Sequence, residues 1–347
     1  MIETDLNSLW FLLIAVLWIG YFFLEGFDFG VGILLPFVGR DDLDRRVAIR
    51  TVGPHWDGNE VWLLVAGGAT FAAFPEWYAT LFSGFYLPLF LILVALIIRG
   101  VAFEFRAKDR RTQWRAWWDR AIFVGSLLPA FLWGVAFANI VGGVPIDAAH
   151  EYTGSLWTLL NPYALLGGLT TLLLFTLHGA TFLGLKAEGP VKDRADSAAR
   201  WMALPTVAVA AGFLAWTLVD AAGAERGDLG LLPLGGLIGV AAVAAVAALA
   251  SIPLLRAGRD GWAFVATGVT IVTATLMLFM TLYPRVMPSS TDAAFSLDIH
   301  NAASTPTTLR VMTVVALIFV PLVLAYQAWS YWVFRKRVSR EQLSPTG

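Results

Sequence analysis

The sequence predicts an all-α protein of the polytopic membrane class, a bundle of about nine transmembrane helices with the N-terminus outside and the C-terminus in the cytoplasm. Of its 347 residues 58% are hydrophobic and only 14% are charged, whereas soluble proteins carry roughly 25% charged residues. Mean hydropathy is +0.70. The apolar residues form runs of about 20, the length that crosses a bilayer as a helix.

Nine stretches fit this length and are separated by short polar loops. In chain order they are about 8–36, 56–74, 79–103, 120–141, 161–185, 201–220, 230–254, 262–284 and 310–334. The first follows an acidic N-terminus and lacks a small-residue cleavage site, so we expect a retained span rather than a signal peptide. The second is interrupted by Gly67-Gly68 and closed by Pro75. No internal repeat or soluble domain interrupts the series, which predicts a single integral-membrane domain over 1–347.

The basic residues predict the orientation, because cytoplasmic loops carry an excess of Lys and Arg. Alternate loops and the C-terminal tail hold most of the 24 basic residues: Arg40, Arg45, Arg46, Arg50, Arg106, Lys108, Arg110, Arg111, Arg115, Arg120, Lys186, Lys192, Arg194, Arg200, Arg256, Arg259, Arg335, Lys336, Arg337 and Arg340. The opposite side has Arg226, Arg285 and Arg310, and Arg99 lies within a span. Only an odd number of spans with the tail inside gives this alternation.

Four carboxyl groups stand inside predicted spans. Glu25 and Asp28 lie in the run EGFDFGVG, and Asp57 and Glu60 lie in GPHWDGNEVWLL. A charge at bilayer depth costs at least roughly 2.5–3.5 kcal/mol, so such groups have a partner, water or a function there. Spacing of three residues puts each pair on one face of its helix. The pattern indicates a route for protons or cations.

The predicted orientation brings further polar groups to the same depth, beneath the cytoplasmic surface. These are His55, Asn59, Arg99 and Glu104. Arg99 is the expected counter-ion, because an opposite charge keeps a buried carboxylate ionised. Structural ion pairing is the alternative for all of these charges, and it stays open for Glu60 and Glu104, close to the interface. For Asp28 and Asp57, which Gly and aromatic residues flank, a functional role is favoured.

Other chemistry is limited by composition. Zero cysteines exclude disulfides, thiolate metal sites and c-type haem attachment, and a net charge of −1 gives no reason to expect nucleic acid as a partner. Of the four histidines, only His55 and His178 fall at similar depth, and ordinary hydrogen bonding is favoured for both. We therefore expect no haem ligand and no metal site in this chain. Two rival functions are a secondary transporter, with midplane ion sites between repeats, and a passive scaffold.

Several segments resemble subunit II of the cytochrome bd-type quinol oxidases. They are EGFDFGVG (25–32), GPHWDGNEVWL (53–63), AGGATFAAFPEWYATLFSGFY (66–86), WRAWWD (114–119), GVAFANIVGGVP (134–145), LLNPYALLGG (159–168) and VMPSST (286–291). The similarity covers nearly the whole chain in order, and the HWDGN and MPSST segments are highly specific. Two positions depart from the pattern: Glu25 stands where relatives have Asp, and His178 where Gln can occur, which argues against a ligand role.

The resemblance implies a respiratory complex of the bacterial plasma membrane that oxidises quinol and reduces dioxygen to water. In that family haem b and haem d are bound by the partner, subunit I, and both large subunits have nine spans. Subunit II is needed for assembly, and an acidic path through it is proposed to bring cytoplasmic protons toward the oxygen-reducing haem. By motif position Asp28 and Asp57 carry over to that path. Some members also hold a quinone in subunit II, and small accessory membrane subunits and membrane lipids are further expected partners.

The glycines and the last outer loop carry two smaller expectations. We expect Gly67-Gly68, like the glycines of GFDFGVG, to allow close helix packing. The outer loop YPRVMPSSTDAAFSLDIHNAASTPTTL is long for its place, and we expect it to pack against a partner subunit.

Overall fold

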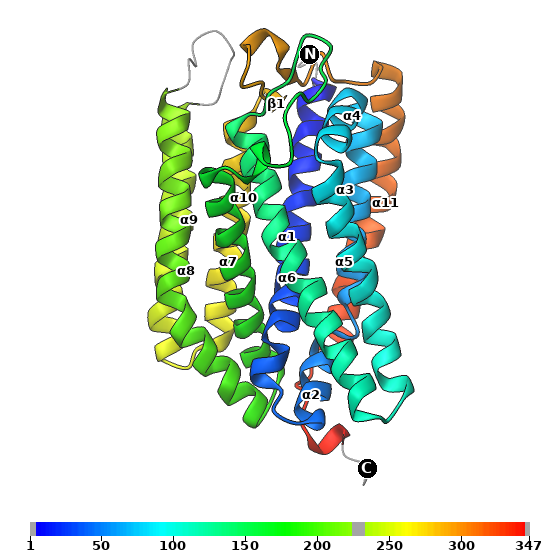
Figure 1. Ribbon diagram of the computed structural model, residues 1–347, viewed down its shortest axis with the longest axis vertical. Coiled ribbons are helices and arrows are strands. Elements are labelled where there is room, and N and C mark those ends of the chain that lie inside the picture. Colours follow the sequence, from blue (N-terminus) through cyan, green and yellow to red (C-terminus); the bar gives the residue numbers. More distant parts are fainter. Residues whose placement is uncertain (1–4, 224–232, 344–347) are drawn as a thin grey trace.

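The computed structural model describes residues 5–223 and 233–343 and is an elongated bundle of helices (Figure 1). The α-helices are α1 Leu6–Val38, α2 Asp42–Val52, α3 Trp56–Ala73, α4 Pro75–Gly84, α5 Tyr86–Phe105, α6 Thr112–Gly142, α7 Pro162–Lys186, α8 Pro190–Gly223, α9 Leu234–Arg256, α10 Asp260–Leu282 and α11 Pro306–Val333. Short 3-10 turns cover Arg106–Lys108, Thr158–Leu160, Ala293–Phe295 and Glu341–Leu343, and strands β1 Arg285–Met287 and β2 Leu297–Asp298 pair antiparallel.

Eight helices of the described residues are long and apolar enough to cross a membrane, namely α1 and α5 to α11. Each overlaps one predicted span. The other predicted span, 56–74, is α3, which is 18 residues long and opens with the polar residues of WDGNE, so length and composition alone do not place it among the eight. Arg226 and the first residues of the predicted span 230–254 lie outside the described residues.

Three predicted boundaries are wrong. The stretch 79–103 is two helices, because the chain breaks at Phe85 between α4 and α5. Helices α6 and α8 begin about two and about three turns, respectively, before the predicted starts at 120 and 201, since their charged first turns continue the helix beyond the apolar stretch. The first basic loop contains the short helix α2, whose Asp41 side chain caps the backbone N–H of Asp44.

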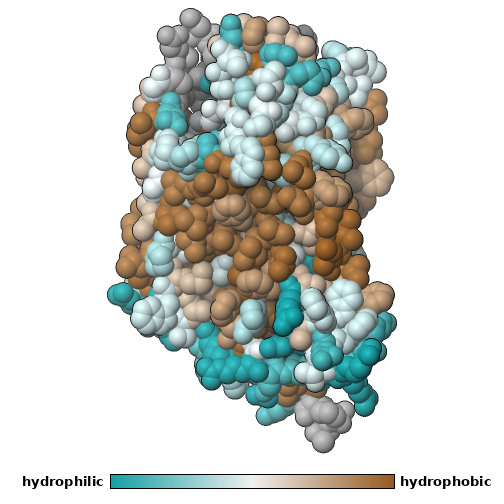
Figure 2. All heavy atoms as spheres, in the orientation of Figure 1, coloured by the Kyte–Doolittle hydropathy of each residue, from teal (hydrophilic) through white to brown (hydrophobic). Residues whose placement is uncertain are grey.

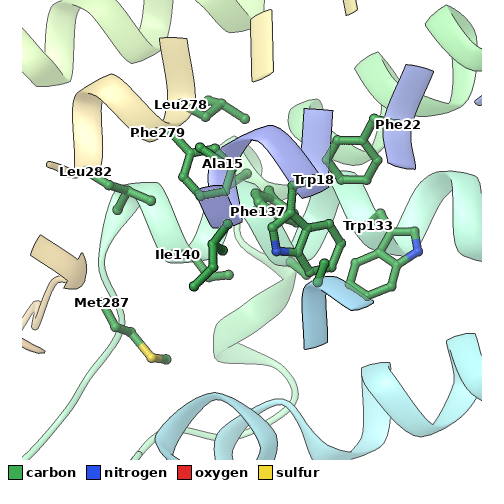
Figure 3. Packing of buried hydrophobic residues seen from close by; sticks show 14 of the residues in the cluster. Ala15, Trp18, Phe22, Trp133, Phe137, Ile140, Leu278, Phe279, Leu282 and Met287 are labelled. Carbon is green, nitrogen blue, oxygen red and sulfur yellow. The ribbon is translucent and has the colours of Figure 1, made fainter. Parts of the chain in front are cut away.

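Helix α1 runs through the middle of the bundle (Figure 1) and is buried along most of its length. Aromatic side chains pack around it, as Figure 3 shows: the Trp18 ring centroid lies 4.9 Å from Trp133 and 4.8 Å from Phe137 of α6. A Cβ atom on Gly30 would lie 2.1 Å from the carbonyl oxygen of Phe175. The backbones of α1 and α7 therefore touch here, as the GFDFGVG glycines predict.

The prediction for Gly67-Gly68 is wrong within this chain. A Cβ atom on either glycine would meet no heavy atom within 4 Å. Both glycines instead line an apolar cavity of about 450 Å³ between α1, α3, α4, α5 and α6.

The predicted basic loops gather at one end of the bundle, where α2 and the 3-10 turn Glu341–Leu343 lie (Figure 1). Figure 2 shows that end as hydrophilic, below a broad hydrophobic belt. Ion pairs tie the loops together: Asp119 of α6 accepts from Arg45 at 2.8 Å, and Arg340 of the tail donates to Asp41 at 2.6 Å. The Lys186 ammonium also donates to backbone carbonyl oxygens of the tail.

Candidate buried acidic site

The predicted acidic residues of α1 lie in the interior, where α3, α5 and α11 meet α1. The side chains of Glu25 and Asp28 are fully buried. Spacing of three residues places them on one face of α1, as the sequence predicts. Both lie toward the end of the bundle that carries α2. Helix α3 begins at that end, and its residue Asn59 contacts Asp28.

Arg99 of α5 joins two of the carboxyl groups. Its Nη2 atom donates to Oε1 of Glu25 and, at 3.1 Å, to Oε2 of Glu60. The guanidinium is fully buried and lies over the ring of Phe29, 4.7 Å from the centroid. The Glu25 side chain is fully buried, whereas that of Glu60 is 22% exposed. One cation thus bridges an interior carboxyl group and one near the surface.

Asp28 is held by a different contact. Its Oδ2 atom accepts a hydrogen bond from Nδ2 of Asn59 at 2.7 Å. The Oδ1 atom of Asn59 accepts from the Tyr331 hydroxyl at 2.7 Å and from Nε2 of Gln327 at 3.3 Å. Both of these donors belong to α11. The Asn59 amide therefore links α1, α3 and α11.

Several atoms of the cluster have no hydrogen-bond partner among the described residues, although they are buried: Oε2 of Glu25, Oδ1 of Asp28, and Nε and Nη1 of Arg99. Glu25, Asp28 and Glu60 together face one guanidinium, so the fully ionised cluster would carry excess negative charge in a region of low polarity. Such an arrangement is suited to taking up protons.

Two predicted residues lie apart from these contacts. Asp57 is exposed in the first turn of α3, and its carboxylate accepts from the backbone N–H of Gly58 at 2.8 Å. Glu104 is exposed and has no side-chain partner within the part of the chain that the structure describes. The structure thus brings Glu25, Asp28 and Glu60 together with Asn59 and Arg99, while Asp57 lies at the surface beside them.

The histidines have separate surroundings. His55 stacks on Tyr331, with ring centroids 4.1 Å apart, and burial, together with the positive charge of Lys186, lowers the pKa of His55 to about 4. It is therefore neutral at neutral pH. His178 stacks on Phe264 of α10, and its Nδ1 atom lies 2.7 Å from the Thr267 hydroxyl. Among the described residues no group of three His, Cys, Asp or Glu is placed to hold a metal ion.

Sequence reasoning missed three residues of the site: Trp62, Gln327 and Tyr331. Trp62 donates to Oε1 of Gln327 at 2.9 Å. A lone Gln in the otherwise apolar stretch of α11 is the signal that could have found this contact, because an amide within a membrane span needs a partner.

Comparisons with known proteins agree with this picture. A family model described as cytochrome bd terminal oxidase subunit II matches residues 6–334. The chain is 44% identical over 344 residues to cytochrome bd ubiquinol oxidase subunit 2 of Bacillus subtilis (strain 168), with 98% of each chain covered. It is 38% identical over 371 residues to cytochrome bd-I ubiquinol oxidase subunit 2 of Escherichia coli (strain K12), with 97% of this chain and 96% of the relative covered.

Among solved structures, bd oxidase from Geobacillus thermodenitrificans matches with a TM-score of 0.76 and 19% identity, over 95% of this chain and 99% of that chain. This similarity shows the same fold. The sequence resemblance is confirmed, and with eight long apolar helices the chain is a multi-pass protein of the bacterial plasma membrane and a subunit of a respiratory oxidase complex. It belongs to the cytochrome bd terminal oxidase subunit II family.

Proposed function

We propose that this chain is one of the two subunits of a heterodimeric quinol oxidase. This subunit ligates no haem, and it conducts protons from the cytoplasm toward the partner subunit. In this proposal subunit I carries haem b and haem d, where quinol is oxidised and dioxygen is reduced to water. The present chain supports assembly of subunit I and supplies the proton path Glu25, Asp28, Asp57 and Glu60. His55, Asn59, Arg99 and Glu104 are its supporting polar groups.

The proposed membrane topology has nine spans in a single domain, with α3 as the ninth, the N-terminus outside and the C-terminus in the cytoplasm. Its support is the gathering of basic loops and the tail at one end of the bundle (Figure 1), together with the positive-inside rule. This topology places the acidic site beneath the cytoplasmic surface.

The observation that carries the proposal is a gradient of exposure along neighbouring acidic groups. Asp57 is exposed, Glu60 is partly exposed and shares Arg99 with Glu25, and Glu25 and Asp28 are fully buried. Carboxyl groups in series, charged yet inside a membrane protein, are characteristic of proton relays. A route that enters at Asp57 and continues inward through Glu60 to Glu25 follows this gradient.

The path would make the oxidase electrogenic without a pump. Protons consumed at the haem would enter from the cytoplasm, and each charge that crosses the membrane is worth about 2.3 kcal/mol per 100 mV. If the chain were a passive scaffold, proton uptake from the cytoplasm would not depend on these carboxyl groups.

The proposed contact face for subunit I is α11 with the outer side of α3. Of the 28 residues of α11 only Leu309 is buried. Most of the exposed side chains of α11 are large and apolar. A helix that is apolar on all sides is normally covered. Small accessory subunits and lipids would occupy other parts of the hydrophobic belt (Figure 2). The cavity beside Gly67 and Gly68 is where we place a bound quinone.

The test is proton uptake by the reconstituted two-subunit complex. In proteoliposomes supplied with quinol, Asp57→Asn should slow uptake from the cytoplasmic side, while the haem content stays that of the wild type. Asp193→Asn is the matched control, because Asp193 is an exposed carboxyl group at the same end that makes no side-chain contact within the described residues. Uptake by Asp57→Asn equal to that of the control would support the scaffold instead.

A further inference from the structure

A chain of side-chain hydrogen bonds runs from Trp62 to Asp28 and crosses three helices. Trp62 of α3 donates to Gln327 of α11 at 2.9 Å, Gln327 donates to Asn59 of α3 at 3.3 Å, and Asn59 donates to Asp28 of α1 at 2.7 Å. Asn59 and Asp28 are fully buried. Every member except Asp28 is uncharged.

The direction of this chain is fixed at its start. An indole N–H can only donate, so the atom of Gln327 that faces Trp62 must be the carbonyl oxygen. The amide nitrogen of Gln327, Nε2, then faces Asn59 and requires the oxygen Oδ1 of Asn59 as its acceptor. The Tyr331 hydroxyl donates to the same oxygen at 2.7 Å. The amide nitrogen of Asn59, Nδ2, is therefore the atom that faces Asp28.

We propose that Trp62, Gln327 and Asn59 are positioning residues that reserve Oδ2 of Asp28 as a hydrogen-bond acceptor, so that Asp28 gains and loses its proton at Oδ1 alone. This inference rests on the proposed function, and it assigns proton binding to one of the two carboxyl oxygens of Asp28. Oδ1 is buried and has no partner within the described ranges.

The same chain blocks proton passage toward α11. To relay a proton, a group must accept one and release another, as a carboxyl group, an imidazole or water does. An amide N–H does not exchange its role in this way, because neutral Asn and Gln have fixed donor and acceptor ends. Protons on Asp28 thus communicate with the acidic side of the cluster and not with the α11 face.

Other charged and titratable groups near Asp28 also influence its protonation. They are Glu25 of α1, Asp57 and Glu60 of α3, Arg99 of α5 and Tyr331 of α11. Substitution at Gln327 alters none of them, and Tyr331→Phe alters only the hydroxyl that donates to Asn59, so the double variant reports on the hydrogen bonds to Asn59.

The experiment removes both donors to Asn59 in the holoenzyme with the double variant Gln327→Leu/Tyr331→Phe. The freed Asn59 amide can then turn its oxygen toward Asp28, which favours the protonated acid. We expect the pH dependence of turnover to move upward by about one pH unit, the effect of losing one hydrogen bond to an ionised group. Tyr326→Phe and Tyr163→Phe are the controls: Tyr326 is exposed on α11, and Tyr163 has its buried hydroxyl bonded to Thr217. Neither control should move the profile.

Infrared difference spectra supply the second readout. The carboxylic C=O band that disappears in Asp28→Asn belongs to Asp28, and it should shift in the double variant and in Trp62→Phe but not in the controls. An unshifted band in both, or an unchanged pH profile in the double variant, would overturn the proposal. The absence of any such band in the wild type would do the same. Because the spectra do not depend on turnover, they separate this failure from failure of the proton path itself.

Discussion

The ion pair between Arg99 and Glu25 allows a quantitative prediction. Both side chains are fully buried, and Arg99 is the charged partner of Glu25 in the structure. Arg99→Met would leave the Glu25 charge uncompensated in the interior. Removing one partner of a buried pair costs about 3–5 kcal/mol. Glu60 adds little to this loss, because its partly exposed side chain can regain water.

The double variant Arg99→Met/Glu25→Gln should recover most of this loss. Replacing both partners by uncharged groups of similar volume removes both charges of the pair, and such replacements are often neutral. Glu25→Gln alone should cost less than Arg99→Met, because Arg99 keeps Glu60 as a partner. A double-mutant cycle on thermal unfolding of the purified complex measures the coupling. If Arg99→Met were as stable as the double variant, the two groups would not be coupled and the reasoning would fail.

Three further predictions concern topology, the cavity and pH. The chain has no native cysteine, so Ser290→Cys should react with an impermeant thiol reagent from outside the cell and Lys336→Cys only from inside; the opposite pattern would reverse the proposed topology. Gly67→Leu should extend into the apolar cavity, because a Cβ atom at Gly67 meets no heavy atom within 4 Å, and should lower the quinone content of the purified complex; an unchanged quinone content would place the quinone elsewhere. The folded chain protonates His55 only near pH 4, whereas an unfolded chain does so near pH 6.5, so stability contributed by neutral His55 is complete above about pH 6.5 and is lost as the pH falls toward 4. His55→Phe keeps the stack on Tyr331 and should reduce this acid sensitivity in thermal unfolding; an identical pH dependence would contradict the assignment.

Much of the architecture could be predicted because membrane burial constrains sequence strongly. Apolar length and the alternation of basic loops locate the spans, and depth alone brings Glu25, Asp28, Glu60 and Arg99 to one level. The pairing of Arg99 with Glu25 follows from their isolation, since Arg99 is the one Lys or Arg that the sequence places away from the ends of a span.

The remaining contacts depend on which helices are neighbours, and sequence depth does not determine this. The lone Gln327 of α11 signals a polar contact, but nothing in the sequence identifies Asn59 as the residue that Gln327 and Tyr331 face. The exposure of Asp57 is likewise set by how α3 rotates about its axis. The break at Phe85 was missed because α4 and α5 together read as one apolar stretch.

The most direct test of the central claim is proton uptake during a single turnover with dioxygen. In the reconstituted Asp28→Asn complex with full haem content, we expect the phase of uptake from the cytoplasmic side to slow markedly relative to Asp193→Asn, with electron transfer between haems intact. An uptake phase as fast as that of the control would show that protons reach the haem by a route that does not use this buried carboxyl group.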